Sequence, residues 1–228
     1  MELYDVMRTT PAVRDYLREP IPDEVVYRIL DNARFAVNGS NHQPWRVIVV
    51  QDRAQRELLR DHYVLGFRES WAYIDRGLRA FAPEFAGGVP PITREEAHAM
   101  THPDAFADNF DQVPVLLLVC LELEVLSVTD NHLDRQSFVG GGSVYPFVQN
   151  ILLGARNEGL GSLLATLVVR QEEELRPIFG IPDTHAIACV VAIGKPRKVI
   201  TKLSRRPVEE FAHVDRFDGP PLTPPAAR

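Results

Sequence analysis

A nearly unbroken apolar run at residues 113–123, VPVLLLVCLEL, limits the possible folds of this chain more than any other segment. Its apolar residues follow one another instead of alternating with polar ones, which is typical of a strand covered on both faces of a sheet. The run therefore predicts a central, fully buried strand. Its uninterrupted part, residues 113–121, contains Pro114 and is too short to cross a bilayer, so we expect no membrane-spanning segment.

The remaining elements are predicted from apolar periodicity and from helix caps. Strands are expected at 46–51, 162–168 and 186–193, and helices at 2–8, 23–34, from Asp52 to about Trp71, from Ser143 to Gly159, and at 171–179. Because these elements do not alternate as regular βαβ units, the predicted class is α+β, with a mixed or antiparallel sheet flanked by helices. Several prolines and glycines predict a mobile loop or lid over 83–105.

The net charge and the cysteine content indicate which partners and which cellular compartment to expect. The net charge of −6 argues against a general nucleic-acid binder, because phosphate backbones would repel the chain. Cys120 and Cys189 lie far apart within apolar runs, which predicts two buried thiols in a reducing compartment. The N-terminus shows no basic-then-apolar leader, so we expect a cytoplasmic protein. The excess of arginine over lysine is typical of a guanine- and cytosine-rich bacterial genome.

Two clusters each leave two interpretations open. The glycines of GGGS, residues 140–143, either give a flexible entry to the following helix or let a ligand approach the backbone. No Lys-Ser/Thr pair follows them, which favours the structural interpretation. His98 and His102, four residues apart, would suit a metal on one helix face, but the adjacent Pro103 favours a solvated face in a loop. We therefore predict no metal site.

Four blocks of the sequence, taken in order, resemble the FMN-dependent nitroreductase family. They are MRTTPAVRDY (7–16), ARFAVNGSNHQPWRVIVV (33–50), VYPFVQNILLGARNEGLGS (144–162) and VAIGKPRKVITKLSRRPVEEF (191–211). The most specific parts are N-x-Q-P-W in the second block and the helix ending in Gly-Leu-Gly in the third. Together the blocks span nearly the whole chain, whereas residues 60–110 and 219–228 match nothing in the family pattern.

The resemblance implies a nitroreductase-like fold, an intertwined homodimer with an exchanged C-terminal arm, and FMN held where the two subunits meet. Arginines near both chain ends would grip its phosphate, which a guanidinium fork suits. Arg14 would lie at the flavin N1/O2 edge, where positive charge favours the anionic reduced flavin. No side chain is implied to act as an obligatory acid or base. The residues implied to contact FMN are Arg8, Thr9, Thr10, Arg14, Asn38, Gly39, Ser40, Asn41, Gln43, Gly161, Leu164, Ala165, Thr166, Leu167, Arg205 and Arg206.

This chain departs from the family pattern at three places. Pro11 and Ala12 are inserted between Thr10 and Arg14. Val37 and Asn38 stand where the family has Pro-Ser, so the loop lacks the usual hydroxyl there. Leu164 and Thr166 stand where Pro and Glu often lie beside the flavin. Thr166 can offer backbone groups and a hydroxyl but no carboxylate. We interpret Trp45, next to this loop, as a core residue in preference to a flavin-stacking one.

The implied activity is that of an oxidoreductase that takes electrons from NADPH or NADH and passes them to a nitroaromatic, quinone or related small acceptor by a ping-pong mechanism. The alternatives are a flavin-sequestering protein without turnover, or a specialised branch such as an oxidase, a dehalogenase or a flavin-fragmenting enzyme. We expect one FMN-binding domain over residues 1–218, with a lid or insert at 60–110 and the arm at 195–218. Residues 219–228 are expected to form a disordered tail.

Overall fold

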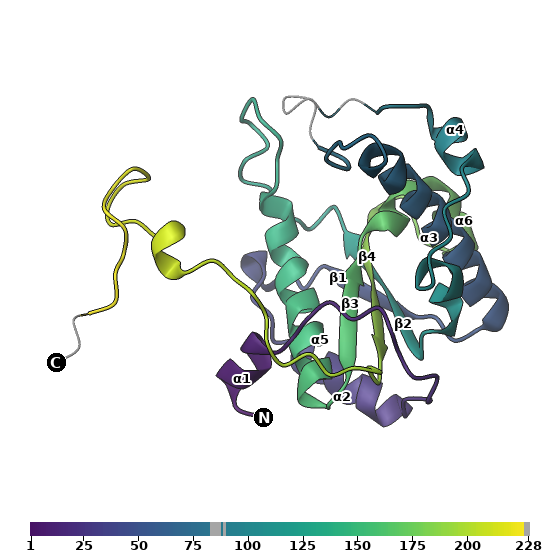
Figure 1. The fold of residues 1–228 in the computed structure, drawn as a ribbon, viewed down its shortest axis with the longest axis horizontal. Helices are drawn as coiled ribbons and strands as arrows, with labels where there is room; N and C mark the ends of the chain where they lie inside the picture. Colours follow the sequence, from purple (N-terminus) through teal and green to yellow (C-terminus); the bar gives the residue numbers. More distant parts are fainter. Residues whose placement is uncertain (83–87, 89, 226–228) are drawn as a thin grey trace.

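The computed structural model describes residues 1–82, 88 and 90–225 (Figure 1). Its helices are α1 (Leu3–Arg8), α2 (Asp23–Ala33), α3 (Arg53–Ile74), α4 (Arg94–Ala99), α5 (Tyr145–Asn157) and α6 (Glu172–Phe179). Its strands are β1 (Trp45–Val49), β2 (Val115–Glu122), β3 (Gly161–Ala165) and β4 (His185–Gly194). Short 3₁₀ helices are η1 (Gly39–Asn41), η3 (Ala107–Gln112), η4 (Val139–Ser143), η5 (Leu167–Gln171) and η6 (Val208–Glu210). Every strand and helix expected from the sequence is present, with small shifts in bounds.

The four strands form one antiparallel sheet in the order β1-β2-β4-β3. β2 lies inside the sheet, where Val115 faces Ile193 of β4 and Leu121 faces Trp45 of β1. All side chains from Val115 to Leu121 are buried. The central strand covered on both faces is therefore confirmed, as is the α+β class.

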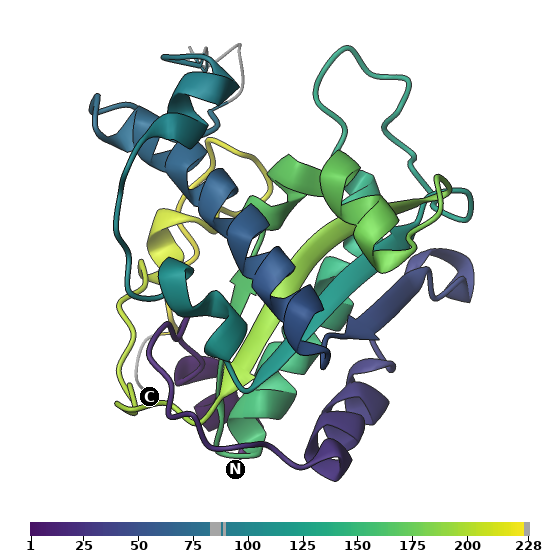
Figure 2. The ribbon, with the colours of Figure 1, turned by 90° about the vertical axis from the view of Figure 1, so that its right-hand side faces the viewer.

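Helices cover both faces of this sheet. Leu116 and Leu118 of β2 point to a core shared with α3, η3 and α6, whereas Leu117 and Val119 point to a second core shared with α2 and α5. This alternation follows from the two-residue period of a strand. Figure 2 shows α3 crossing the front of the sheet, with α5 behind it. The sheet is thus the middle of three layers.

The ends of the helices test the predicted caps. Asp52 caps α3 as expected, because its carboxylate accepts a hydrogen bond from the Gln55 N–H at 3.0 Å. The predicted cap of α5 is wrong. The Ser143 hydroxyl accepts the Gly39 N–H at 3.1 Å, and Val144 occupies the cap position without a side-chain bond. A distant loop therefore takes the acceptor that the sequence assigned to the helix.

The segment over 83–105, expected to be a mobile loop or lid, contains the helix α4. Thr93 and Glu96 form a reciprocal capping box at its start, in which each side chain accepts the other residue's N–H. The prediction that His98 and His102 form a solvated face is also wrong. His98 contacts the buried carboxylate of Glu69, and the ring of His102 stacks on Trp71 with centroids 3.9 Å apart. Residues 83–87 and 89 of this segment lie outside the described residues.

The C-terminal arm, residues 195–218, leaves the body of the chain. Figure 1 shows it passing α1 and then extending away from the other elements. It carries large apolar side chains that its own chain does not cover, including Phe211, which is 59% exposed, and Phe217, which is fully exposed. His213 of the arm pairs with Pro221, which follows the arm, in an isolated bridge, so the chain turns back on itself there.

Both cysteines are buried and unbonded, as the sequence predicted. Cys120 and Cys189 belong to the cores on opposite faces of the sheet. Burial raises the pKa of Cys120 to about 11 and that of Cys189 to about 12, so both thiols stay protonated at neutral pH. Within the described part of the chain, no helix combines the length and the apolar character needed to cross a membrane.

Candidate functional site

The N-terminal segment lies along the outer edge of the sheet, beside β3. Ala12 pairs with Ser162, and the Val13 N–H donates to the Ser162 carbonyl at 2.9 Å. A Cβ at Gly161 would lie 2.7 Å from a methyl carbon of Val13, so only glycine permits this approach. Gly161 therefore acts through close packing here, and it holds Arg14 next to the start of β3.

The two threonines implied in phosphate binding sit at the end of α1. The Thr9 and Thr10 hydroxyls donate to the carbonyls of Asp5 and Val6, each at 2.6 Å. Arg156 of α5 donates from Nε to the Thr9 hydroxyl at 3.0 Å. These bonds secure the end of α1 against α5.

Four arginines of the predicted site have no carboxylate partner in the part of the chain that the structure describes. Among the described residues, Arg8, Arg14, Arg205 and Arg206 have no acidic group within ion-pair distance, and all four are exposed. The guanidinium carbon of Arg8 lies 5.8 Å from the centre of the Tyr4 ring. In a chain of net charge −6, free guanidinium groups near both ends suit a dianionic phosphate. The donor chemistry fits FMN.

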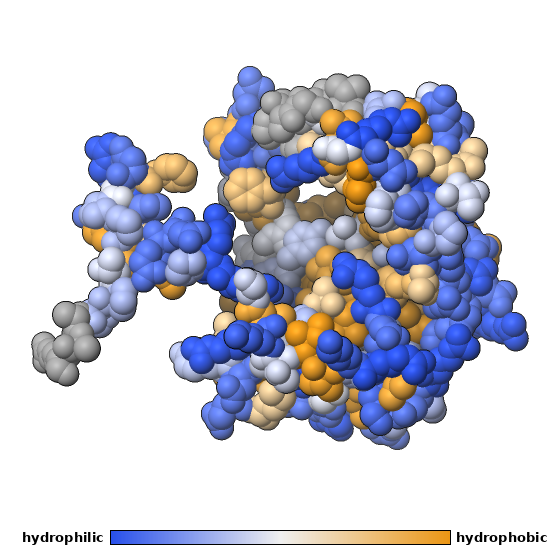
Figure 3. Space-filling view, in the orientation of Figure 1, coloured by the Kyte–Doolittle hydropathy of each residue, from blue (hydrophilic) through white to orange (hydrophobic). Residues whose placement is uncertain are grey.

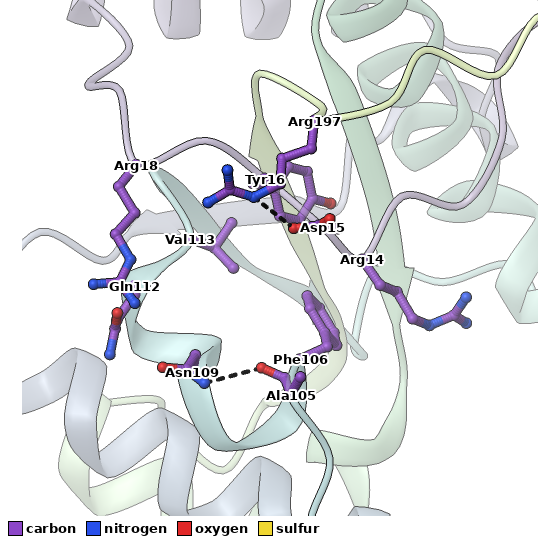
Figure 4. A pocket seen from close by; sticks show the side chains of 10 residues that line it. All are labelled: Arg14, Asp15, Tyr16, Arg18, Ala105, Phe106, Asn109, Gln112, Val113 and Arg197. Atoms are coloured by element: carbon purple, nitrogen blue, oxygen red, sulfur yellow. Dashed lines mark hydrogen bonds and ion pairs between the residues drawn. The ribbon is translucent and has the colours of Figure 1, made fainter.

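Arg14 also borders a small cavity of about 150 Å³ between the N-terminal segment and η3 (Figure 4). Arg197 is paired there with Asp15 at 3.1 Å, whereas the guanidinium of Arg14 points away from the other lining residues. The cavity is too small for a flavin ring system, since ligand pockets usually span roughly 300–1,000 Å³. Arg14 is thus free to reach a group outside this cavity.

The loop at 38–43 holds three residues in the left-handed region within four positions. Ser40, Asn41 and Gln43 have φ of 50°, 58° and 50°. The Asn38 side chain supports this shape, because its Oδ1 accepts the Gln43 N–H at 2.9 Å. Such conformations in non-glycine residues are sparsely populated and cluster at ligand sites. Trp45, just after the loop, stacks on Phe147 with centroids 4.7 Å apart, which supports its interpretation as a core residue.

The segment after β3 is pressed against α3. A Cβ at Gly66 would lie 2.3 Å from the carbonyl oxygen of Leu167. Gly66 is buried in the middle of α3, so the helix and the Leu167 backbone touch directly. Thr166, one residue earlier, stays exposed. The backbone implied to face the flavin ring is therefore held from behind by α3.

A cavity of about 280 Å³ opens beside Thr166. In the orientation of Figure 3 the molecule is hollowed in the region between α5 and α3. The cavity receives residues from four places in the chain: the segment that follows α3, the start of α5, the segment from Thr166 through η5, and β4. Its lining residues are Phe81, Tyr145, Thr166, Leu167, Val169, Arg170, Ile187 and Ala188.

Residues 7–195 of this chain, most of its length, match the Nitroreductase family. The chain belongs to the nitroreductase family. It is 25% identical over 221 residues to a nitrobenzene nitroreductase of Ectopseudomonas oleovorans, covering 91% of this chain and 94% of that protein. It is 26% identical over 209 residues to an NADH dehydrogenase of Thermus thermophilus, covering 87% of this chain and 88% of that protein.

Solved structures share this fold. The crystal structure of an iodotyrosine deiodinase bound to FMN and 3-iodo-L-tyrosine superposes with a TM-score of 0.67 at 24% identity, covering 95% of this chain and all of that one. A protein from Desulfovibrio desulfuricans, solved in complex with FMN, gives a TM-score of 0.64 at 20% identity. The match covers 95% of this chain and 98% of that one. The nitroreductase-like fold expected from the four blocks is confirmed.

A single nitroreductase chain places the sequence-predicted residues in three groups. The first comprises Arg8 to Arg14 with the two ends of β3, which the bridge at Ser162 joins. The second is the loop at 38–43, whose described bonds outside the loop go to the adjacent Ala36 and to the distant Ser143 and Val125. The third is the arm with Arg205 and Arg206, which extends away from the body (Figure 1). The bonds of the described residues do not join these groups into one site within one chain.

Sequence reasoning missed a buried acidic centre next to the predicted site. Glu69 of α3 is 4% exposed, and its carboxylate contacts His98 of α4 at 2.7 Å and Arg94 at 3.1 Å. It also accepts from Arg170 at 2.7 Å and from Gln171 at 2.8 Å, both in η5. One carboxylate thus ties α4 and η5 to α3. A lone glutamate in a long helix gives no sequence signal of burial, whereas Gly66 could have indicated a close approach.

Burial by itself would raise the pKa of Glu69, but hydrogen bonds from His98 and Arg170 outweigh it and hold the pKa below the usual 4.5. The unfolded chain therefore binds a proton at Glu69 more readily than the folded chain. The contribution of this carboxylate to stability is complete above about pH 4.5 and is lost as the pH falls below it.

Replacement of Glu69 by Gln should lower the free energy of unfolding by about 2–3 kcal/mol at neutral pH, because charged hydrogen bonds are lost. Urea unfolding at a series of pH values measures this difference, which should shrink in acid. Glu57→Gln is the control, since that exposed partner of Arg53 in the same helix should contribute less than about 0.5 kcal/mol. A Glu69→Gln difference that stayed constant from neutral to acid pH would contradict the assignment.

Proposed function

We propose that this protein is an FMN-dependent oxidoreductase that accepts electrons from NADH or NADPH and delivers them to a small organic acceptor such as a nitroaromatic or a quinone. The observation that carries the proposal is the family match over residues 7–195. The names of the relatives agree with it, since they are a nitrobenzene nitroreductase and an NADH dehydrogenase. The arginines near both chain ends, which pair with no carboxylate of the described residues, would supply the binding chemistry.

FMN, when bound, supplies the hydride chemistry of the reaction. The chain supplies binding, orientation and charge. Arg8, Arg205 and Arg206 would bind the phosphate, and Arg14 would bring positive charge toward the N1/O2 edge. The Leu167 backbone, pressed against Gly66, keeps the segment at the ring in place. No residue is assigned as an obligatory acid or base.

We also propose a homodimer with a shared active site. The arm carries exposed apolar side chains that a second copy would cover, and it extends away from the body. The loop at 38–43 precedes β1, which lies at the opposite edge of the sheet from β3. Across a dimer, the partner's loop and arm would complete the site around Arg14 and Thr166. Cytoplasmic location is part of the same proposal.

The purified protein should be yellow, and NADH or NADPH should bleach the bound-flavin absorption within seconds without oxygen. Steady-state initial rates with donor and acceptor varied together should give parallel double-reciprocal lines, because each substrate acts in turn at one site. A yellow protein that neither donor bleaches would favour flavin sequestration. Intersecting lines would contradict the ping-pong mechanism.

A further inference from the structure

The cavity beside Thr166 has the size and the lining for one aromatic ring. Its volume of about 280 Å³ is just below the roughly 300–1,000 Å³ of pockets for drug-sized ligands, so it suits a smaller molecule. Leu167, Ile187 and Ala188 give it apolar walls, and Phe81 and Tyr145 add aromatic rings. Such walls favour a flat apolar ring, because aromatic pairs attract beyond their buried area.

Among the described residues that line this cavity, Arg170 is the one with a charged side chain. The guanidinium of Arg170 lies 5.1 Å from the centre of the Phe81 ring, and its Nε donates to Glu69 at 2.7 Å. These two contacts fix the direction of the guanidinium group. The two terminal nitrogens have no acceptor among the described residues, and the side chain is 48% exposed. A planar fork held this way suits a carboxylate.

Glu69 does not cancel the charge of Arg170. The same carboxylate also contacts Arg94 and His98 and accepts from Gln171, so its negative charge is shared among several donors. Arg94 in turn pairs with Glu174 at 3.3 Å. Glu69 lies behind Arg170, at 4% exposure, and is not among the residues that line the cavity. The cavity therefore presents positive charge at one end of an aromatic slot.

We propose that this cavity binds single-ring aromatic acceptors that carry a carboxylate, with Arg170 binding the carboxylate and Phe81 and Tyr145 flanking the ring. The proposal rests on the proposed function, because it places the acceptor beside the segment at Thr166 and Leu167. It adds a substrate class, anionic aromatics in preference to neutral ones, and a residue that determines it.

Equilibrium dialysis of the full-length yellow protein against benzoate and against benzamide tests this inference without turnover. The two probes have nearly the same shape and differ in charge. Benzoate should bind roughly tenfold more tightly than benzamide, as one charged hydrogen-bonded contact would produce. Equal affinities for the two probes would overturn the proposal, and this comparison needs no variant.

Replacement of Arg170 by Gln tests the assigned residue. Glutamine keeps an N–H group that can reach Glu69, and Glu69 retains its three other partners, so the fold should persist. This variant should bind benzoate roughly tenfold more weakly, and its KM for 4-nitrobenzoate should rise roughly tenfold, with less than twofold change for benzamide and nitrobenzene. Arg53→Gln, at an arginine that is 92% exposed on α3, is the control and should change neither.

Equal weakening of benzoate and benzamide by Arg170→Gln would overturn the role of Arg170. Flavin retention and bleaching by NADH or NADPH are measured on the same samples, and they test the proposed function separately. Protein that bleaches but does not discriminate benzoate from benzamide would overturn the carboxylate site and leave the oxidoreductase proposal standing. Protein that does not bleach would remove the oxidoreductase proposal itself.

Discussion

Deletion of residues 199–228 is expected to give a folded monomer without bound flavin. The arm adds little to the core of its own chain, because nearly all of its side chains are exposed and neither core cluster includes them. The remaining body keeps both cores and the complete sheet, so it should still unfold cooperatively. The apolar side chains that we propose a second copy covers are lost with the arm, and the dimer should be lost with them.

The flavin should be lost for a separate reason. The deletion removes Arg205 and Arg206, two of the four arginines without a carboxylate partner among the described residues. A charged hydrogen bond contributes about 1.5–3 kcal/mol, so losing two phosphate contacts would reduce FMN affinity by two orders of magnitude or more, on the order of 100-fold. Light scattering measures the mass of the particle, and visible absorption measures the flavin that it carries.

Two further chains separate these effects. Deletion of residues 219–228 alone keeps both arginines together with Phe211 and Phe217, so it should remain a yellow dimer. The double substitution Arg205→Ala, Arg206→Ala in the full-length chain should remain a dimer but bind FMN weakly. A chain ending at residue 198 that was still a yellow dimer would refute both the exchanged arm and the assignment of these arginines.

Substitution of Gly66 by Ala is expected to destabilise the protein and to weaken FMN binding. The new methyl would lie 2.3 Å from the Leu167 carbonyl oxygen and 3.0 Å from its carbon, and these backbone atoms cannot rotate away. Overpacking typically costs 1–3 kcal/mol, whereas alanine gains about 1 kcal/mol over glycine in a helix interior. Because the contact is with backbone at very short range, we expect a net loss of about 2 kcal/mol.

The same overlap should move the segment that carries Thr166 and Leu167. Flavin binding should therefore weaken along with the urea midpoint. Gly154→Ala on α5 is a matched control, because that Cβ would lie 3.4 Å from a methyl of Ile29, an ordinary contact. It should be neutral or stabilising. A Gly66→Ala protein as stable and as yellow as the unmodified one would show that the contact between α3 and Leu167 is not needed.

Several elements were predictable because their causes are local. The apolar run at 113–121 required a covered strand whatever lay beside it, and Asp52 had its capping partner three residues away. Gly159, with φ of 78°, ends α5 as expected of a left-handed residue after a helix. The family could be recognised for a related reason, since its pattern consists of short blocks with fixed internal spacing.

The predictions that were wrong concern residues whose partners lie far away in the sequence. Ser143 was expected to cap its own helix, but the Gly39 N–H, 104 positions away in the sequence, takes the hydroxyl. His98 was expected to face solvent, but α4 folds onto α3 and brings it to Glu69. In each case the residue type allows several partners, and local spacing cannot choose among them.

The amino-acid sequence by itself determined the strands, most of the helices, the two buried thiols and membership of the nitroreductase family. These properties depend on periodicity, caps and motif spacing, which act over a few residues. Only the tertiary structure decided that Glu69 is a buried centre for four donors, that Gly66 touches the Leu167 backbone, and that Arg170 faces an aromatic cavity. Burial, close contact and pKa depend on which distant segments meet, and that follows from packing the two helical layers onto one sheet.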